Sequence, residues 1–250
     1  MKVGLFGFGK TGKAVATVLL LNEGVHLCWV IRKSNLLQHR SVPEYLGIPD
    51  DDTGLIFPKD EWTPSSLLDE HPVDAIIDFS SAEAIYYYGE EAARRDIAIV
   101  SAISAYPDAT VDFLKQLAKQ TRVLWSPNIT IGINFLMLAA KVLKSIAPYT
   151  DIEIIEEHFK GKKEISGTAK KIAHALSLGE DCIKTIRAGG IVGRHEVLFG
   201  FPYQTVRLTH DSISREAFGN GALFGAQNLL NHKKGLYSME DLLIPYFNLG

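Results

Sequence analysis

This sequence has little cysteine, no long apolar run and no large excess of charge of either sign. Its 250 residues hold two cysteines, Cys28 and Cys182, so we expect no disulfide framework and a reducing compartment, the cytoplasm. The longest apolar runs, 14–21 and 133–140, fall well short of the ~20 residues that a membrane span requires. Glycines and lysines within the first dozen residues interrupt any signal-peptide core. The net charge of -3 provides no broad basic field, so neither a membrane nor a nucleic acid is an expected partner.

The first half of the sequence alternates short apolar segments with segments of helical periodicity. Expected strands are 2–6, 25–31, 75–79, 97–101 and 123–125, and expected helices are 11–22, 83–95 and 111–120. Strands that alternate with helices in this way form a doubly wound parallel sheet of Rossmann type. This α/β fold is the predicted architecture of the first domain.

After Pro127 the pattern becomes that of a smaller α+β domain. Helices are expected at 135–147 and 168–178, and strands at 152–156, 185–188, 195–199 and 205–210. The turn at Gly200-Phe201-Pro202 indicates antiparallel pairing, so the second sheet is expected to be mainly antiparallel. We place the first domain at 1–127, completed by 214–250 with a closing helix at 217–230, and the second domain at 128–213.

A glycine motif at the first strand-to-helix turn predicts a dinucleotide site. Gly7-Phe8-Gly9-Lys10-Thr11-Gly12 fits G-x-G-x-x-G and lies between an expected strand and an expected helix. The first glycine permits a tight turn, the second lets the backbone approach a pyrophosphate, and the third allows close helix packing. The helix N-terminus then faces the phosphates. A purely structural glycine turn is the alternative.

The residues after the second strand bear on the choice of cofactor. Folds that bind NAD usually carry a carboxylate about 20 residues beyond the glycines, but Arg32 and Lys33 occupy that place. Two cations suit the 2′-phosphate of NADP, so NADPH is expected to be preferred, with NADH possible. A solvated basic pair on a loop is the alternative.

Segment 156–169 concentrates the chemistry of the second domain. His158 is a candidate proton donor near neutral pH. Cations come from Lys160, Lys162 and Lys163, and the expected helix start at Ser166, Gly167 and Thr168 is an anion site. Together they predict a small dianionic substrate beside a proton source. A solvated lysine-rich loop with a Ser or Thr helix cap is the alternative. We find no metal-ligand spacing among His, Cys, Asp and Glu, and so expect no metal.

This segment resembles the signature E-x-H-H-x-x-K-x-D-A-P-S-G-T-A of the 4-hydroxy-tetrahydrodipicolinate reductase (dihydrodipicolinate reductase) family. The resemblance extends over nearly the whole chain, through the glycine turn, 78–81, 126–134, 187–195, 209–210 and 214–215. It implies an NAD(P)H-dependent oxidoreductase that reduces a dianionic cyclic imine, 4-hydroxy-tetrahydrodipicolinate, in diaminopimelate and lysine biosynthesis. It also implies that the second domain binds substrate and builds a homotetramer through its sheet.

The resemblance assigns roles to individual residues. His158 matches the proposed acid and Lys162 the signature lysine, while Ser166, Gly167 and Thr168 match the group that grips a substrate carboxylate. Positions that line the nicotinamide and its ribose are matched by Phe79, Ser80 and the stretch 126–129, with Ser126, Asn128 and Ile129 as its cofactor-binding residues. Ser101 and Ala102 fall where the family has a G-T-T turn.

The sequence departs from the signature within the same segment. Phe159 stands at the second histidine, a substrate-binding position; Glu164 replaces the aspartate, and Ile165 alone replaces the alanine-proline pair. These departures leave open a Rossmann oxidoreductase acting on another amino or imino acid. A third alternative is an NADPH-binding paralogue without turnover. His195 and His210 lie in strands where the family lines its cavity, and a structural role stays open for both.

Overall fold

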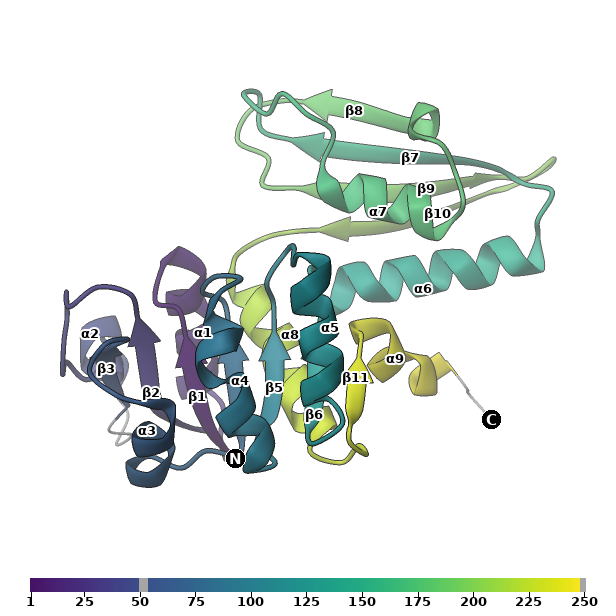
Figure 1. Ribbon diagram of the computed structural model, residues 1–250. Helices are drawn as coiled ribbons and strands as arrows, with labels where there is room; N and C mark the ends of the chain where they lie inside the picture. The colour runs from purple at the N-terminus through teal and green to yellow at the C-terminus, as the bar shows by residue number, and fades with distance from the viewer. Residues whose placement is uncertain (50–53, 248–250) are drawn as a thin grey trace. The chain divides into compact units, whose positions relative to one another are not determined.

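The computed structural model describes residues 1–49 and 54–247, which form two compact units (Figure 1). The first unit comprises Met1–Thr130 and Phe218–Pro245, and the second comprises Ile131–Ala217 with Tyr246 and Phe247. The unit boundaries thus lie a few residues beyond the positions 127 and 214 expected from sequence. The last two described residues belong to the second unit rather than the first.

The first unit is built on a seven-stranded sheet in the order β11-β6-β5-β4-β1-β2-β3. Neighbouring strands run parallel throughout the described residues. The strands are β1 (Lys2–Phe6), β2 (His26–Arg32), β3 (Leu55–Pro58), β4 (Ala75–Asp78), β5 (Ala98–Ser101), β6 (Arg122–Trp125) and β11 (Gly235–Tyr237). The strand order reverses between β1 and β4, and open α/β sheets bind ligands beyond the carboxyl ends of the strands at such a point.

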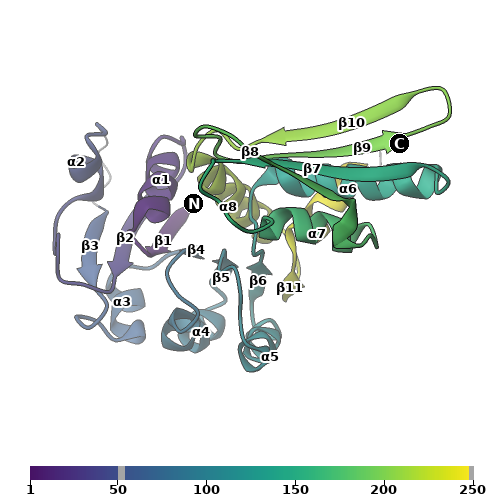
Figure 2. The same cartoon turned by 90° about the horizontal axis from the view of Figure 1, so that it is seen from above.

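Helices cover both faces of this sheet (Figure 2). One face carries α1 (Lys10–Leu20) and α8 (Glu216–Leu229), and the other carries α3 (Pro64–Glu70), α4 (Ala84–Arg94) and α5 (Asp108–Leu117). The short helix α2 (Val42–Leu46) follows β2, and the short helices α9 (Met239–Leu243) and η2 (Ile244–Phe247) follow β11. Because both faces are covered, β4 and β5 are buried along their whole length and are apolar except for their last residues, Asp78 and Ser101.

The second unit has a four-stranded sheet in the order β10-β9-β7-β8. Its strands are β7 (Asp151–His158), β8 (Ile183–Arg187), β9 (Arg194–Gly200) and β10 (Thr205–Asp211). Strand β9 pairs antiparallel with both β7 and β10, and β8 pairs parallel with β7. Helices α6 (Ile131–Ile146) and α7 (Gly167–Ala175), the latter followed by η1 (Glu180–Cys182), bury one face of the sheet around Leu136, Ile154, Ile172 and Phe199. The predicted fold class is therefore confirmed in both parts.

Two details of the second sheet go beyond what the sequence predicted. Strand β8 is parallel to β7 because α7 connects them, and a crossover helix returns the chain in its original direction. Strand β7 continues to His158, two residues beyond its predicted end, because it pairs with β8 and β9 along that length. His158 is therefore a buried strand residue and not a loop residue.

Several elements of the first unit were not predicted. Between the second and third expected strands the chain forms α2, β3 and α3. The side chains of Ser41 and Thr63 cap the two helices, and a proline lies in the first turn of each. These elements are only four to seven residues long, too short to show a periodic pattern in the sequence.

The helices of residues 1–49 and 54–247 include none whose length and hydropathy would let it cross a membrane.

Candidate active site

Three glycines in the turn after β1 have different structural requirements. Gly7 has a φ of 97°, a left-handed conformation that favours glycine, and its N–H donates to the Ile31 carbonyl at 2.8 Å. A Cβ on Gly12 would lie 2.0 Å from the Gly7 carbonyl oxygen. A Cβ on Gly9 would meet no atom within 4 Å, so the backbone there is open to an approaching phosphate.

A cavity of about 940 Å³ adjoins this turn. Its walls include seven of the predicted cofactor residues: Gly7, Phe8, Gly9, Arg32, Lys33, Phe79 and Ser80. The first turn of α1 adds the partial positive charge of a helix N-terminus. Glycine backbone, helix terminus and cations are the donor set that an anionic dinucleotide requires, so these residues fit such a cofactor.

Charged residues that the sequence reasoning missed also line this cavity. Lys59 follows β3, and its N–H donates to the Arg32 carbonyl at 2.9 Å, which brings a third cation to the same wall. The carboxylates of Asp60 and Glu83 line the cavity as well. Lys59 and Asp60 carried no signal, because the strand that delivers them was not predicted.

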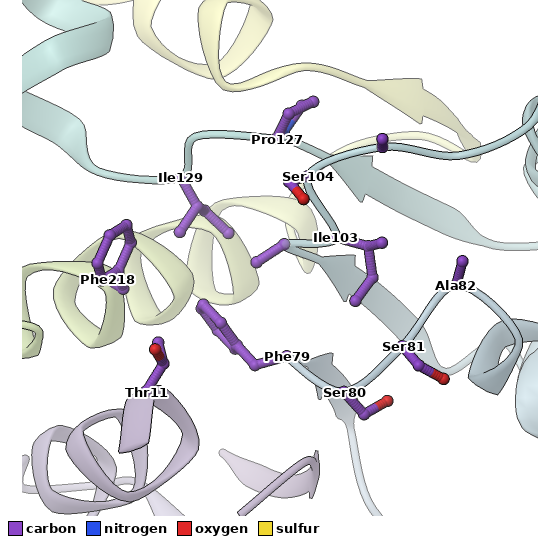
Figure 3. A pocket seen from close by; sticks show the side chains of 12 residues that line it. Thr11, Phe79, Ser80, Ser81, Ala82, Ile103, Ser104, Pro127, Ile129 and Phe218 are labelled. Carbon is purple, nitrogen blue, oxygen red and sulfur yellow. The ribbon is translucent and has the colours of Figure 1, made fainter. Parts of the chain in front are cut away.

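A second cavity of about 530 Å³ shares Phe79 and Ser80 with the first (Figure 3). Thr11, Ala102 and Ile129, all predicted, also line it, together with Pro127 from the predicted stretch 126–129 and Phe218, which was not predicted. Figure 3 shows Thr11, Phe79, Ile129 and Phe218 around one space. Two phenyl rings, aliphatic side chains and serine hydroxyls are surfaces that suit a flat heteroaromatic ring with a polar edge.

Five predicted cofactor residues line neither cavity: Lys10, Gly12, Ser101, Ser126 and Asn128. Lys10 begins α1 and is exposed. The buried Ser101 hydroxyl pairs with the Tyr106 hydroxyl at 2.7 Å. The Ser126 hydroxyl donates to the Asn128 carbonyl at 2.7 Å, and the Asn128 amide oxygen accepts from Thr130.

Behind the shared wall of the two cavities, Asp78 fixes the loop that carries Phe79 and Ser80. This carboxylate is fully buried at the end of β4; it accepts from the Ser80 N–H at 2.8 Å and from the Tyr88 hydroxyl at 2.9 Å. Burial raises the pKa of Asp78 to about 6, although the hydrogen bonds from Ser80 and Tyr88 act in the opposite direction. Sequence inspection singled out Asp78 only as part of a motif.

In the second unit, His158 lies at the end of β7 and is 7% exposed. Its Nδ1 is in ion-pair contact with Glu156, whose other oxygen accepts from Arg187. Burial lowers the pKa of His158, the Glu156 charge opposes this, and the charge of Lys162 adds to it. Burial alone would raise the pKa of Glu156, but the hydrogen bond from Arg187 and the charge on His158 lower it, so the carboxylate stays ionised.

His195 on β9 joins this group. Its ring meets that of His158 edge to face, with 5.3 Å between centroids, and its Nε2 pairs with the Ser166 hydroxyl at 2.9 Å. Burial lowers the pKa of His195 to about 4, so the ring is uncharged at neutral pH. The same Ser166 hydroxyl accepts from the Ala169 N–H at 3.0 Å and caps α7.

The other predicted residues of this segment lie around these. Gly167 begins α7 and Thr168 is in its first turn, half-buried. Lys162 is half-buried and Phe159 is 47% exposed. Ser166, Gly167 and Thr168 thus form a capped helix start, with His158 linked to it through His195.

Glu156, His158 and His195 each offer one atom of a kind that can bind a metal ion, and these atoms lie within 4.8 Å of one another. Spacing along the sequence did not reveal this group. The Glu156 carboxylate already faces the Arg187 guanidinium and the His158 ring. The Glu156 charge is therefore already balanced by Arg187.

The chain is similar to known proteins along its length. Residues 1–129 match the family model described as dihydrodipicolinate reductase, N-terminus, and residues 129–243 match the one described as dihydrodipicolinate reductase, C-terminus. A Caldanaerobacter subterraneus subsp. tengcongensis protein named 4-hydroxy-tetrahydrodipicolinate reductase is 35% identical over 210 residues, which covers 75% of this chain and 84% of that protein. A Lawsonia intracellularis protein of the same name is 32% identical over 206 residues, covering 72% and 80%.

The fold is also found in a solved structure. The dipicolinate-bound dihydrodipicolinate reductase of Paenisporosarcina sp. TG-14 superposes with a TM-score of 0.78 over 95% of this chain and 97% of that one. At 22% identity this likeness bears on the fold alone.

Proposed function

The chain belongs to the dihydrodipicolinate reductase family, and we propose that it reduces 4-hydroxy-tetrahydrodipicolinate to tetrahydrodipicolinate in diaminopimelate and lysine biosynthesis. As a member of this family it is an NAD(P)H-dependent oxidoreductase with a nucleotide-binding N-terminal region. The observation that carries the proposal is the buried His158–Glu156 pair near the capped start of α7. A proton source and an anion site are what the reduction of a dianionic cyclic imine requires.

In the proposed reaction water leaves the hydroxylated ring, and the resulting conjugated imine gains a hydride and a proton. A bound nicotinamide nucleotide supplies the hydride. His158 supplies the proton; burial lowers the pKa of its ring, and the charge of Glu156 opposes that lowering. General acid assistance of this kind is worth about 10²- to 10⁴-fold in rate.

Lys162 and the start of α7 are proposed to hold the substrate carboxylates. The α7 N-terminus offers N–H groups at Gly167 and Thr168, and the Ser166 cap supports that terminus. The Paenisporosarcina reductase is bound to dipicolinate, a planar dicarboxylate. A site of this kind in our chain would bind the two carboxylates of the substrate through charge and helix dipole together.

For the cofactor we propose NADPH, with NADH as a weaker alternative. Arg32, Lys33 and Lys59 line the larger cavity and suit a 2′-phosphate. Asp60 and Glu83 line the same cavity and could accept from ribose hydroxyls, so NADH retains partners as well. The cations outnumber the carboxylates, which supports the preference for NADPH.

We further propose a homotetramer in the cytoplasm. The family resemblance implies assembly through the second unit's sheet, and the open face of that sheet carries the exposed apolar side chain of Ile186. The scarcity of cysteine suits a reducing compartment.

The direct test is oxidation of NADPH by the purified protein, followed by nicotinamide absorbance, with the substrate generated in place by its synthase and NADH run in parallel. Rapid oxidation with NADPH, and slower oxidation with NADH, is the expected result. Tight NADPH binding without oxidation would reject this substrate. A panel of other imino acids would then test the alternative that Phe159 and the shortened loop suggest.

A further inference from the structure

We propose that Glu156 and Arg187 are the positioning residues of this site: Arg187 holds Glu156 against His158 and, with the same guanidinium, fixes the segment that carries Lys162. The inference rests on the proposed function, because it concerns how the proton donor and the substrate cation are held in place. Neither residue touches the reacting atoms in this scheme.

Glu156 is a fully buried carboxylate with two separate partners. One oxygen accepts from the Arg187 guanidinium, and the other contacts Nδ1 of His158. A buried carboxylate is costly unless it is paired, and here the Arg187 guanidinium donates a hydrogen bond to one oxygen while the His158 ring contacts the other. The pairing therefore defines one orientation of the His158 ring.

That orientation determines which nitrogen of His158 is offered to substrate. Nδ1 faces Glu156, which leaves Nε2 on the other side of the ring. A Cβ added to Gly193 would lie 3.1 Å from Nε2. Because residue 193 is a glycine, its backbone passes Nε2 with no side chain against this nitrogen. Nε2 is the donor atom in our scheme, and Glu156 keeps it turned away from the carboxylate.

The groups that face His158 come from three strands and one loop. Glu156 lies on its own strand, Arg187 on β8, His195 on β9 and Lys162 on the segment after β7. Burial and the charges of Lys162 and Arg187 all disfavour the protonated ring, and His195 is uncharged at neutral pH. Among these groups Glu156 alone favours the protonated form that a general acid needs.

Arg187 also restrains the segment between β7 and α7. Its Nε donates to the Lys162 carbonyl at 2.9 Å, and its Nη2 donates to the Glu164 carbonyl at 3.0 Å. Segment 159–166 contains no proline to stiffen its backbone. A guanidinium can hold these two carbonyls and the Glu156 carboxylate at once because its donors form a rigid fork.

The test replaces Glu156 by glutamine, which keeps the shape and removes the charge. Histidine side-chain NMR of the folded protein, with the His158 signal assigned from H158Q, follows the pKa of His158 without any substrate. We expect it to fall by about one unit or more, because an oppositely charged neighbour shifts a pKa by that much. The alkaline limb of the pH profile of kcat/KM should move to lower pH by the same amount. At pH values above the shifted pKa, kcat/KM should be about tenfold lower than in the wild type.

E153Q is the matched control. Glu153 lies on the same strand but is half-buried and pairs with Lys184 at 3.1 Å. This variant should leave both the His158 titration and the pH profile unchanged. E156D keeps the negative charge, so it should return the His158 pKa most of the way to its wild-type value. This variant separates the effect of lost charge from the effect of a disturbed fold.

R187K tests the second half of the proposal. Lysine keeps the positive charge beside Glu156 but cannot serve three acceptors in a fixed plane. We expect KM for the imine to rise about tenfold or more as the Lys162 segment loosens, while the alkaline limb of the pH profile stays in place. An unchanged KM would reject the role of Arg187 in holding this segment.

The readouts separate this inference from the proposed function. An unchanged His158 pKa in folded E156Q would overturn the role of Glu156, whether or not the enzyme reduces this substrate. A lowered His158 pKa in a protein that fails to oxidise NADPH with the proposed substrate would uphold the positioning pair and reject the substrate.

Discussion

At the residue scale, buried ionisable side chains distinguish the two units. Asp78 in the first unit and Glu156 in the second are both fully buried carboxylates. Asp78 is partnered by neutral donors, so burial raises its pKa, whereas Glu156 meets Arg187 and remains ionised. Asp78 holds a loop and Glu156 contacts the proposed proton donor, His158. The different neighbours of the two carboxylates set their different pKa values.

Replacing His158 by glutamine removes the proposed proton donor while keeping a polar side chain of similar length. We expect kcat to fall by about 10²- to 10⁴-fold, measured by steady-state NADPH oxidation. H174Q on the exposed side of α7 is the control and should keep full activity. A kcat of H158Q within twofold of the wild type would remove His158 from the mechanism.

Replacing Lys162 by alanine removes a cation that, in the proposed function, pairs with substrate in both the ground state and the transition state. KM should therefore rise and kcat should fall, so that kcat/KM changes by more than either constant alone. The neighbouring exposed lysine provides the comparison, and K163A should change kcat/KM by less than about threefold. Equal effects of the two substitutions would indicate a diffuse basic loop and no specific contact.

Asp78 predicts a pH-dependent stability. Its pKa is raised to about 6 in the fold but lies near 3.9 in an unfolded chain, so the folded state binds the extra proton. The stabilisation is complete below about pH 4 and is lost as pH rises through about 6. Relative to D78N, the wild-type free energy of unfolding should fall by about 2 to 3 kcal/mol across that range. Urea unfolding of both proteins at several pH values measures this, and a constant difference would contradict it.

At the element scale, the turn between β1 and α1 uses its glycines for different purposes. A Cβ at residue 12 would strike the Gly7 carbonyl, whereas a Cβ at residue 9 would meet open space. Gly12 is therefore required by the fold, and Gly9 by whatever approaches the backbone. The two positions form a natural matched pair.

G12A should destabilise the first unit by about 1 to 3 kcal/mol, because the carbonyl must move to admit the methyl group. G9A should leave the unfolding midpoint unchanged but weaken NADPH binding by about tenfold or more, since the methyl group occupies the place of a phosphate. Thermal unfolding and fluorescence titration with NADPH measure the two effects. Unaltered NADPH affinity in G9A would argue against a pyrophosphate at this turn.

The segment between β7 and α7 shows how one element can be held by another. Its carbonyls at Lys162 and Glu164 are bound by Arg187 of the neighbouring strand, and Ser166 caps the helix that follows. The register that sets His158 opposite Arg187 is what brings this guanidinium to the segment. The position of Lys162 thus depends on strand pairing as much as on the loop's own sequence.

At the scale of the whole molecule, the proposed homotetramer makes the open face of the second sheet an interface. Ile186 is 45% exposed and shares a face with Glu157. I186D should therefore cost the isolated subunit little stability but place a charge within the subunit contact. Light scattering after gel filtration should show four times the 27.6 kDa chain mass for the wild type and a smaller species for I186D.

L21D is the control for this experiment, because Leu21 is equally apolar and 66% exposed at the end of α1 in the first unit. It should leave the mass unchanged. A wild type that elutes as a monomer would reject the homotetramer outright, and a tetrameric I186D would move the interface to another face.

The sequence predicted those parts of the fold that rest on local periodicity. Its strands and helices before Trp125 recur within a few residues of their expected places, because buried parallel strands are continuous apolar runs. It missed β3 and the residues that β3 delivers, Lys59 and Asp60, because a four-residue strand has no period to detect.

What the sequence determined by itself is the order of elements, the glycine turn and the segment that holds His158, Lys162 and Ser166, since each depends on residues close together in the chain. Only the tertiary structure decided which side chains meet that histidine. Glu156 is two residues away, but Arg187 and His195 arrive from strands almost thirty and forty residues further on. Strand pairing brings them together, and burial then sets their charges, because the cost of a charge depends on the neighbours that folding provides.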